Sequence, residues 1–348
     1  MGNKITVMLV DDSAVIRQTI GQLLAADPQI ELLGAHSNPL FAMKAMERQR
    51  PDVLVLDLEM PGMDGLTFLK SLMRSQPLPV IICSSITQTG ARSSVEALAA
   101  GAVEIFTKPV MTSKDDLMQM GREIVTAVKT AARAKIHKLP SFSQAAVNRL
   151  STQSSAEQAR LIAIGTSTGG TQAIESLLTQ LPVTVPPIVI VQHMPAAFTK
   201  AFAERMDQVS TLQVCEAQDQ QKLLPGHAYI APGALHLQVE KRGAEFYTMV
   251  KDGPPVSRHK PSVNVLFSSV AKAAGAAAKG FILTGMGDDG ARGLLEMHQA
   301  GAKTYAQDEA SSVVFGMPKE AIKLGAVTQI LSLQEIAMLL GKIQFVRT

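Results

Sequence analysis

The sequence predicts an α/β protein made of two doubly wound domains. In each half of the 348-residue chain, short runs rich in Val, Ile and Leu alternate with segments of helical periodicity. This alternation is typical of strands and helices that form a mostly parallel sheet. A segment rich in Ser, Gln and Ala separates the two halves. A chain of this length can build two or three domains, each with its own core.

The first half, residues 1–125, predicts a five-stranded parallel sheet of the flavodoxin-like type. Helical segments such as 14–26 and 39–48 separate the strands, and a last helix is expected over 114–135. The strand-like runs are 6–10, 31–35, 53–56, 80–83 and 103–106.

From residue 126 to 159 we interpret the chain as a helix end followed by a flexible linker. The second domain, residues 160–348, again alternates between strands and helices, so we expect a mostly parallel α/β fold. Its strand-like runs are 161–164, 188–191, 212–216 and 281–283, and its helical segments include 171–181, 196–206 and 263–277. Between 228 and 249, closely spaced strand-like runs with glycines at the turns predict an antiparallel excursion.

Composition excludes several classes of protein. The net charge is +3, and the basic excess lies mainly in residues 126–159, so neither domain predicts a nucleic-acid-binding face. No apolar stretch is long enough for a membrane span, and no secretory signal opens the chain. The two cysteines lack metal-ligand spacing, and Cys83 reads as a core residue; this usage fits the cytoplasm.

Polar residues follow the strand ends of the first domain. Asp11 and Asp12 end the first strand, Asp57 ends the third, and Ser84 and Lys108 follow the fourth and fifth. Carboxylates at neighbouring strand ends repel one another unless a cation such as Mg²⁺ neutralises them. The set therefore indicates phosphoryl transfer to Asp57, with Ser84 bonding the new phosphoryl group. Alternatively, these aspartates are solvated strand ends or helix caps, as Asp12 could be.

Ser167, His193 and Asp289 each follow a different strand-like run of the second domain. The carboxyl ends of parallel strands form one crevice, so the three side chains can meet there. A serine nucleophile needs such neighbours, because its hydroxyl is inert until a positioned base takes the proton. His259 is the main rival as base. The residues alone do not separate Asp289 from Asp288, and either could cap the helix that follows.

The turn around Ser167 fits the pattern Gly-x-Ser-x-Gly, which exposes a hydroxyl between a strand and a helix. Such a turn can instead cradle a phosphate. However, no Gly-Lys-Ser/Thr follows, and the next strand ends in Gln192-His193 rather than in an acidic residue. The order Ser, His, Asp also differs from that of α/β-hydrolases, which favours a different fold with a convergent triad.

Three segments of the first half carry a family resemblance: Val10-Asp-Asp-Ser13, Leu56-Asp-Leu-Glu-Met-Pro-Gly-Met-Asp-Gly65 and Phe106-Thr-Lys-Pro109. They resemble response-regulator receiver domains. The resemblance implies that a chemotaxis histidine kinase phosphorylates Asp57 and that Ser84 and Lys108 are switch residues. It also implies an Mg²⁺ site with Asp12 and Asp57 as direct ligands, Asp11 in support and the Glu59 carbonyl as a further ligand. Ile105 stands where receivers often have an aromatic switch residue, which puts the relay of the signal in doubt.

Six segments of the second half carry another resemblance. They are Gly165-Thr-Ser-Thr-Gly-Gly170, Gln192-His-Met194, Tyr229-Ile-Ala-Pro-Gly233, Arg258-His-Lys-Pro261, Leu283-Thr-Gly-Met-Gly-Asp-Asp-Gly290 and Ala306-Gln-Asp-Glu-Ala-Ser-Ser-Val-Val-Phe-Gly-Met-Pro318. They are similar to the catalytic domain of chemotaxis protein-glutamate methylesterases. The resemblance implies a triad of Ser167, His193 and Asp289, with the Met286 backbone N–H as an oxyanion donor. Position 288 is usually Asn in this family and is Asp here.

Together the two resemblances imply a phosphorylation-activated hydrolase. It would cleave glutamate γ-methyl esters of chemoreceptors, release methanol and need no cofactor for this reaction; some members also deamidate receptor glutamines. The expected partners are the kinase and methylated chemoreceptors, with no nucleic acid and no membrane insertion, for a cytoplasmic monomer. The alternative is a response regulator whose output domain binds a partner or nucleotide without chemistry.

Overall fold

The computed structural model describes residues 4–60, 64–85, 87–108, 114–136 and 158–346. The chain forms two compact units, residues 1–136 and 137–348, and each is described by itself. Within the predicted helix end and linker, 126–159, residues 137–157 lie outside the described residues. Within the described ranges, no helix combines the length and apolar character needed to cross a bilayer.

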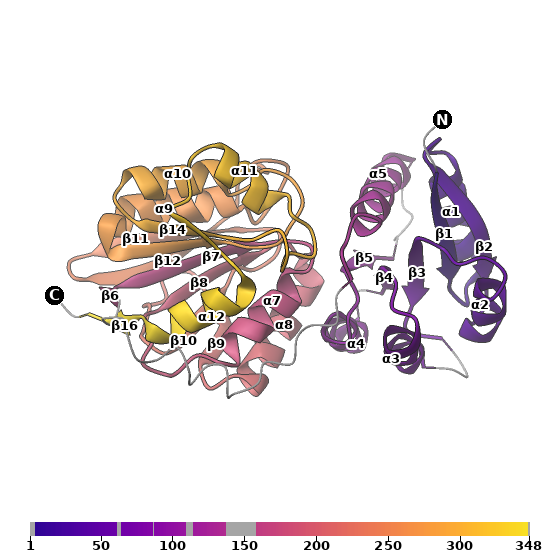
Figure 1. Ribbon diagram of the computed structural model, residues 1–348, viewed down its shortest axis with the longest axis horizontal. Helices are drawn as coiled ribbons and strands as arrows, with labels where there is room; N and C mark the ends of the chain where they lie inside the picture. The colour runs from indigo at the N-terminus through magenta and orange to yellow at the C-terminus, as the bar shows by residue number, and fades with distance from the viewer. Residues whose placement is uncertain (1–3, 61–63, 86, 109–113, 137–157, 347–348) are drawn as a thin grey trace. The chain divides into compact units, whose positions relative to one another are not determined.

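The first unit contains a five-stranded parallel sheet in the order β2-β1-β3-β4-β5 (Figure 1). Its strands are β1 (Ile5–Val10), β2 (Ile30–His36), β3 (Val53–Asp57), β4 (Val80–Ser84) and β5 (Glu104–Thr107). Its helices are α1 (Ala14–Ala25), α2 (Pro39–Met46), α3 (Gly65–Ser75), α4 (Gln88–Ala99) and α5 (Lys114–Ala131). Helices α1 and α5 pack together on one face, and α2, α3 and α4 cover the other. The predicted fold is confirmed.

Local sequence explains where these elements begin. Every residue of β3 and β4 is buried, as expected for central strands of a parallel sheet with helices on both faces. Side chains that accept a backbone N–H cap the first turns of the helices. These N-caps are Ser13 for α1, Asn38 for α2, Asp64 for α3 and Thr87 for α4.

The second unit has a seven-stranded parallel sheet in the order β15-β14-β13-β7-β8-β10-β9. Its strands are β7 (Leu161–Thr166), β8 (Ile188–Gln192), β9 (Gln213–Glu216), β10 (His227–Ile230), β13 (Ala278–Ile282), β14 (Lys303–Gln307) and β15 (Gln329–Leu331). Its helices are α7 (Gly170–Leu178), α8 (Ala196–Val209), α9 (Val263–Ala274), α10 (Ala291–Gln299), α11 (Met317–Lys323) and α12 (Leu333–Lys342). Helices α9, α10 and α11 cover one face, and α7, α8 and α12 cover the other (Figure 1).

Two further pairs of strands lie outside the central sheet. β11 (His236–Arg242) and β12 (Glu245–Lys251) form an antiparallel hairpin, which confirms the predicted excursion. The excursion is shorter than predicted, because β10 pairs in parallel with β8 and β9 in the central sheet. A short parallel pair of β6 (Gln158–Ala159) and β16 (Gln344–Phe345), absent from the prediction, joins the two ends of the unit.

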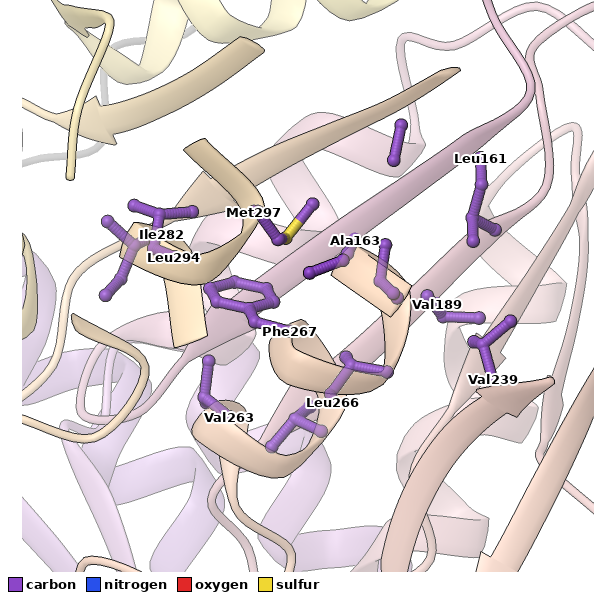
Figure 2. Packing of buried hydrophobic residues seen from close by; sticks show 14 of the residues in the cluster. Leu161, Ala163, Val189, Val239, Val263, Leu266, Phe267, Ile282, Leu294 and Met297 are labelled. Atoms are coloured by element: carbon purple, nitrogen blue, oxygen red, sulfur yellow. The ribbon is translucent and has the colours of Figure 1, made fainter. Parts of the chain in front are cut away.

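The core of the second unit forms where α9 packs on the sheet. Phe267, Leu266 and Val263 of α9 are fully buried and belong to one cluster with residues of β7, β13 and α10, several of which are labelled in Figure 2. Gly165 in β7 permits this packing, because a β-carbon there would overlap the Val263 side chain. The first turn of α9 therefore lies directly against the carboxyl end of β7.

We expect Gly165→Ala to destabilise the second unit by about 1–3 kcal/mol, because the added methyl group has no space beside Val263. Calorimetry of the full chain should show its melting temperature lowered by roughly 2–4 °C per kcal/mol. The matched control is Gly341→Ala in α12, where an added β-carbon meets no atom within 4 Å. This second change should leave the melting temperature unchanged or raise it, since alanine is favoured in helix interiors. An unchanged melting temperature for Gly165→Ala would contradict the packing described.

Candidate functional site

The first unit gathers carboxylates where the order of its strands reverses. Asp11 follows β1 and Asp57 ends β3, which are neighbours in the sheet. Oxygen atoms of Asp11, Asp12 and Asp57 lie within 4.8 Å of one another. Asp11 and Asp57 are fully buried and Asp12 is exposed. In doubly wound sheets, ligands bind at this switch point, and three carboxylates suit a hard cation.

Lys108 faces this cluster from the end of β5. Its Nζ lies 3.0 Å from Asp11 Oδ2 and 2.7 Å from Asp57 Oδ2, and neither buried oxygen accepts a well-formed hydrogen bond from the described residues. Burial raises the pKa of Asp57 above its ordinary value, although Lys108 opposes the shift. Burial disfavours the charged form of Lys108, but Asp57 and Asp11 outweigh it and raise the pKa of Lys108. The two buried oxygens with spare acceptor capacity fit a metal ion, and the cluster could bind one.

Ser84 and Glu59 also lie beside this cluster. The Ser84 hydroxyl is buried and donates to the carbonyls of Ser85 and Gly90, at 3.4 and 3.3 Å, rather than to Asp57. The Glu59 carboxylate accepts from the hydroxyls of Ser85 and Thr87, while its backbone N–H donates to Asp57 Oδ1 at 3.1 Å. The side chain of Glu59 is therefore turned to the β4–α4 connection, which leaves only its carbonyl for the predicted role as ligand.

Ser167 follows β7 at the switch point of the second sheet, between β8 on one side and β13 on the other. The turn is held from both sides. The Ser167 N–H donates to the Thr284 carbonyl beyond β13 at 3.0 Å, and its carbonyl accepts from Gly170 N–H at 2.7 Å. Gly169 adopts a left-handed φ of 76°, which allows the sharp entry into α7.

His193 follows β8, where Gln192 is paired in register with Thr166. Its side chain is only 8% exposed, and its Nε2 lies 2.8 Å from Asp289 Oδ2. Its Nδ1 is buried and has no hydrogen-bond partner among the described residues. The ring is thus oriented by Asp289 through one nitrogen, and the other nitrogen is left to accept a proton. No hydrogen bond joins it to Ser167 here, and catalytic contacts often close only when substrate is bound.

Asp289 is the inward member of the adjacent pair and has a fully buried side chain. Besides His193, three donors reach its carboxylate: the Ser262 hydroxyl at 2.7 Å, Val263 N–H at 2.7 Å and Asn264 N–H at 3.1 Å. Burial alone would raise the pKa of Asp289, but the bonds from His193, Ser262 and Val263 outweigh it and lower that pKa. The carboxylate therefore stays charged beside His193. Asp289 accepts the first N–H groups of α9 and does not cap the helix that follows it in the sequence, a possibility that the sequence left open.

Asp288, the outward member, is exposed and lies 3.4 Å from Arg258 Nη2. This exposed ion pair offsets the extra charge at the position where the resembled family usually has Asn. Neither aspartate side chain caps α10, which begins after Gly290 in a left-handed conformation with φ 93°.

His259, the predicted rival, lies face to face with His193. The two ring centroids are 3.8 Å apart, and the ring planes differ by 6°. Burial first, and the neighbouring His193 second, lower the pKa of His259 to about 4. His259 is therefore a neutral ring at neutral pH, in contact with the candidate base.

The segment Gly285-Met286 runs close to Ser167. A β-carbon on Gly285 would come within 2.7 Å of Ser167 Cβ, so only glycine allows this approach. The backbone of Met286, the predicted oxyanion donor, thus follows directly after the point of contact. Backbone N–H groups so near a nucleophile are of the kind that stabilise an oxyanion.

Two side chains not among the predicted site residues complete the arrangement. The Gln192 amide donates to the carbonyls of both Ser167 and His193, at 3.0 and 2.9 Å, and so ties the two loops together. Ser262 contacts Asp289 directly. Gln192 belongs to the motif Gln192-His-Met194, but the prediction gave it no role. Ser262 follows the motif that ends at Pro261 and carries no signal of its own in the sequence.

Comparison with known proteins finds a separate family match in each half of the chain. Residues 7–122 match the family model of the response regulator receiver domain, and residues 162–340 match that of the CheB methylesterase. The chain is 55% identical to protein-glutamate methylesterase/protein-glutamine glutaminase 2 of Dechloromonas aromatica, covering 97% of each chain. It is 52% identical to protein-glutamate methylesterase/protein-glutamine glutaminase 1 of Chromobacterium violaceum, covering 98% of this chain and 99% of the relative.

The second half of the chain is also similar to a solved structure. The crystal structure of the Thermotoga maritima CheB methylesterase catalytic domain is 34% identical, with a TM-score of 0.52, and covers 53% of this chain and 98% of the solved chain. The two family models and the relatives together cover nearly the full length of the chain. The chain therefore belongs to the CheB methylesterase family, with an N-terminal response-regulator receiver domain.

Proposed function

We propose that the protein hydrolyses γ-methyl esters of glutamate side chains on methyl-accepting chemotaxis receptors, and that phosphorylation of Asp57 activates it. The observation that carries the proposal is the orientation of His193. Its Nε2 bonds the buried Asp289, and its buried Nδ1 has no hydrogen-bond partner in the part of the chain that the structure describes. His193 follows β8, which is paired with β7, the strand that precedes Ser167. A serine nucleophile, a base and a carboxylate that orients the base are the parts needed for ester hydrolysis.

In the first step, the Ser167 hydroxyl attacks the carbonyl carbon of the ester while His193 Nδ1 accepts the hydroxyl proton. The negative charge of the tetrahedral intermediate develops on the carbonyl oxygen, where the Met286 N–H is the proposed donor. Asp289 stabilises the imidazolium that forms, because its charge is held beside Nε2. The intermediate collapses as His193 returns the proton to the leaving oxygen, and methanol departs.

In the second step, His193 removes a proton from water, which attacks the acyl-enzyme. The new intermediate collapses as His193 returns this proton to the Ser167 oxygen, and the released glutamic acid loses its own proton to the solvent. No metal or other cofactor takes part in this proposed cycle. The same residues can attack a glutamine amide with loss of ammonia, and the relatives are named for both activities. Deamidation is therefore part of the proposal.

The receiver domain is proposed to control this reaction through Asp57. Its carboxylate would take a phosphoryl group from a chemotaxis histidine kinase, with Ser84 and Lys108 as switch residues. Mg²⁺ is the proposed metal, held by Asp12 and Asp57 with Asp11 in support and the Glu59 carbonyl. When bound, it would neutralise charge on the phosphoryl oxygens. Phosphorylation would then bias a two-state receiver that sets the esterase activity.

The cytoplasm is the proposed place of action. Both cysteines are free thiols, and burial raises the pKa of Cys83, so this thiol stays protonated and inert in the core. Free, unreactive thiols fit a reducing compartment.

We expect Ser167→Ala to reduce methanol release from methylated receptor membranes by at least about a thousandfold, because the nucleophile is lost. Labelling by a serine-directed phosphonate should disappear as well. The matched control is Ser176→Ala in α7, which removes a buried hydroxyl that bonds no other described residue and should leave both readouts intact. Full activity of Ser167→Ala would show that the nucleophile is assigned wrongly.

We expect Asp57→Asn to abolish the stimulation of methanol release by a small phosphodonor, because the amide cannot take the phosphoryl group. The measurement is the ratio of initial rates with and without phosphodonor in the presence of Mg²⁺. Glu47→Gln makes the same charge change at an exposed carboxylate after α2 and should keep the stimulation. Stimulation that persists in Asp57→Asn would rule out control through this residue.

His259 is proposed to be a neutral neighbour of the base, and this has a consequence for stability. Its pKa is about 4 when folded and about 6.5 in an unfolded chain, so between these values the unfolded state binds more protons. Stability should therefore fall as the pH falls from about 6.5 towards 4. In His259→Phe, which keeps a flat ring against His193, the loss in unfolding free energy of the second unit between pH 7 and 5 should be smaller by about 1–2 kcal/mol. Equal losses in variant and wild type, measured by urea unfolding, would disprove this.

A further inference from the structure

Ser262 stands between the N-terminus of α9 and the candidate triad. Its residue is fully buried, and it is the N-cap of α9. Its hydroxyl oxygen accepts from Val265 N–H at 3.4 Å, as the side chain of an N-cap residue usually does. Its hydroxyl proton is donated to Asp289 Oδ1 at 2.7 Å. One side chain therefore both caps the helix and contacts the carboxylate that orients His193.

A buried histidine fixes the backbone of Ser262 in turn. The Ser262 N–H donates to His236 Nδ1 at 3.2 Å, and His236 Nε2 lies 3.0 Å from the Pro254 carbonyl. Because Nδ1 accepts and the carbonyl needs a donor, His236 carries its proton on Nε2. The chain of contacts runs from Pro254 through His236 and Ser262 to Asp289. His236 holds the backbone of Ser262 in place, and the bonds to Asp289 and from Val265 orient the hydroxyl.

The hydrogen bond that Ser262 donates to Asp289 is not required for capping the helix. A cap requires only an acceptor, which Asn and Asp provide as well as Ser. Asp289 Oδ1 receives Ser262 and Asn264, while Oδ2 receives Val263 and His193. With Oδ1 held on the side of α9, the carboxylate is fixed about its last torsion and Oδ2 is presented to His193.

We propose that Ser262 is a positioning residue for ester hydrolysis, which locks the Asp289 carboxylate so that it orients His193. This inference rests on the proposed function. Ser262 itself touches no substrate; it acts through Asp289. Its loss should therefore lower the rate of the chemical steps and leave substrate binding nearly unchanged.

The test compares Ser262→Ala, Ser262→Gly and Ser262→Thr with wild type in the full-length protein. Rates of methanol release are divided by the concentration of active sites titrated with a serine-directed phosphonate. Alanine and glycine should both lower kcat about tenfold with KM changed less than about twofold, since binding and catalysis separate in this way when only the transition state is affected. Threonine keeps the hydroxyl and should recover most of kcat.

The pH profile gives a readout that a structural role would not move. Without the Ser262 donor, Asp289 keeps more negative charge for the imidazolium, so the acid limb of kcat/KM should move to higher pH in the alanine and glycine variants. The other titratable or charged groups near this pair are His259, Arg258 and Asp288 on the adjoining loops and His236 behind Ser262. All of them remain in every variant.

Two comparisons separate a loss of fold from a loss of position. Glycine serves at an N-cap far better than alanine, so Ser262→Gly remains informative if Ser262→Ala fails to fold. Ser332→Ala removes the N-cap of α12, whose hydroxyl bonds Glu335 rather than Asp289, and should leave kcat and the acid limb unchanged. A wild-type kcat and acid limb per active site in Ser262→Gly would overturn the proposal, as would an equal fall in Ser332→Ala. A wild-type protein that released no methanol would instead remove the proposed function, and this inference with it.

Discussion

The second domain depends on how a single buried carboxylate is compensated. A charge removed from water costs several kcal/mol unless donors replace the solvent. Asp289 receives four: two backbone N–H groups at the start of α9, the Ser262 hydroxyl and His193. Three of the four belong to one helix terminus, whose dipole also favours a negative charge. The carboxylate can therefore remain ionised in the interior only while α9 keeps its place.

Val263 connects the candidate triad to the hydrophobic core. The first residue of α9, Val263, donates to Asp289 through its N–H and fills the core with its side chain. The same side chain presses on two glycines, Gly165 in β7 and Gly290 after the Asp289 turn, and a β-carbon on either would overlap it. The strand that leads to Ser167 and the turn that carries Asp289 are thus packed against one residue. A substitution in the core around Val263 should therefore shift the positions of Ser167 and Asp289.

The sequence predicts the elements and strand-end residues well, because both follow from local patterns. Ser167, His193 and Asp57 stand at the ends of apolar runs, and parallel topology brings such ends together. What local patterns do not contain is the contact between α9 and Asp289, which joins residues more than twenty positions apart. From the residues alone, the choice between Asp288 and Asp289 depended on that contact, as did the contact of Ser262. The bonds of Gln192 to the carbonyls of Ser167 and His193 also join segments that are distant in the sequence. The parallel pairing of β10 with β8 and β9 was also missed, because the residues of a short strand do not show whether it pairs in parallel or antiparallel.

In both domains a buried aspartate lies at the carboxyl edge of a parallel sheet, but the surroundings shift the two pKa values in opposite directions. Asp57 is buried beside a lysine side chain, and burial raises its pKa, so its charge is poorly compensated. Asp289 is buried among fixed N–H and O–H donors, which lower its pKa below the ordinary value. Under the proposed function, Asp57 accepts and loses a phosphoryl group and needs partners that can be exchanged, whereas Asp289 orients a base and needs partners that stay in place. A single lysine side chain suits the first need and a packed helix terminus suits the second. The fold sets the position of each aspartate, and its donors decide what it can do.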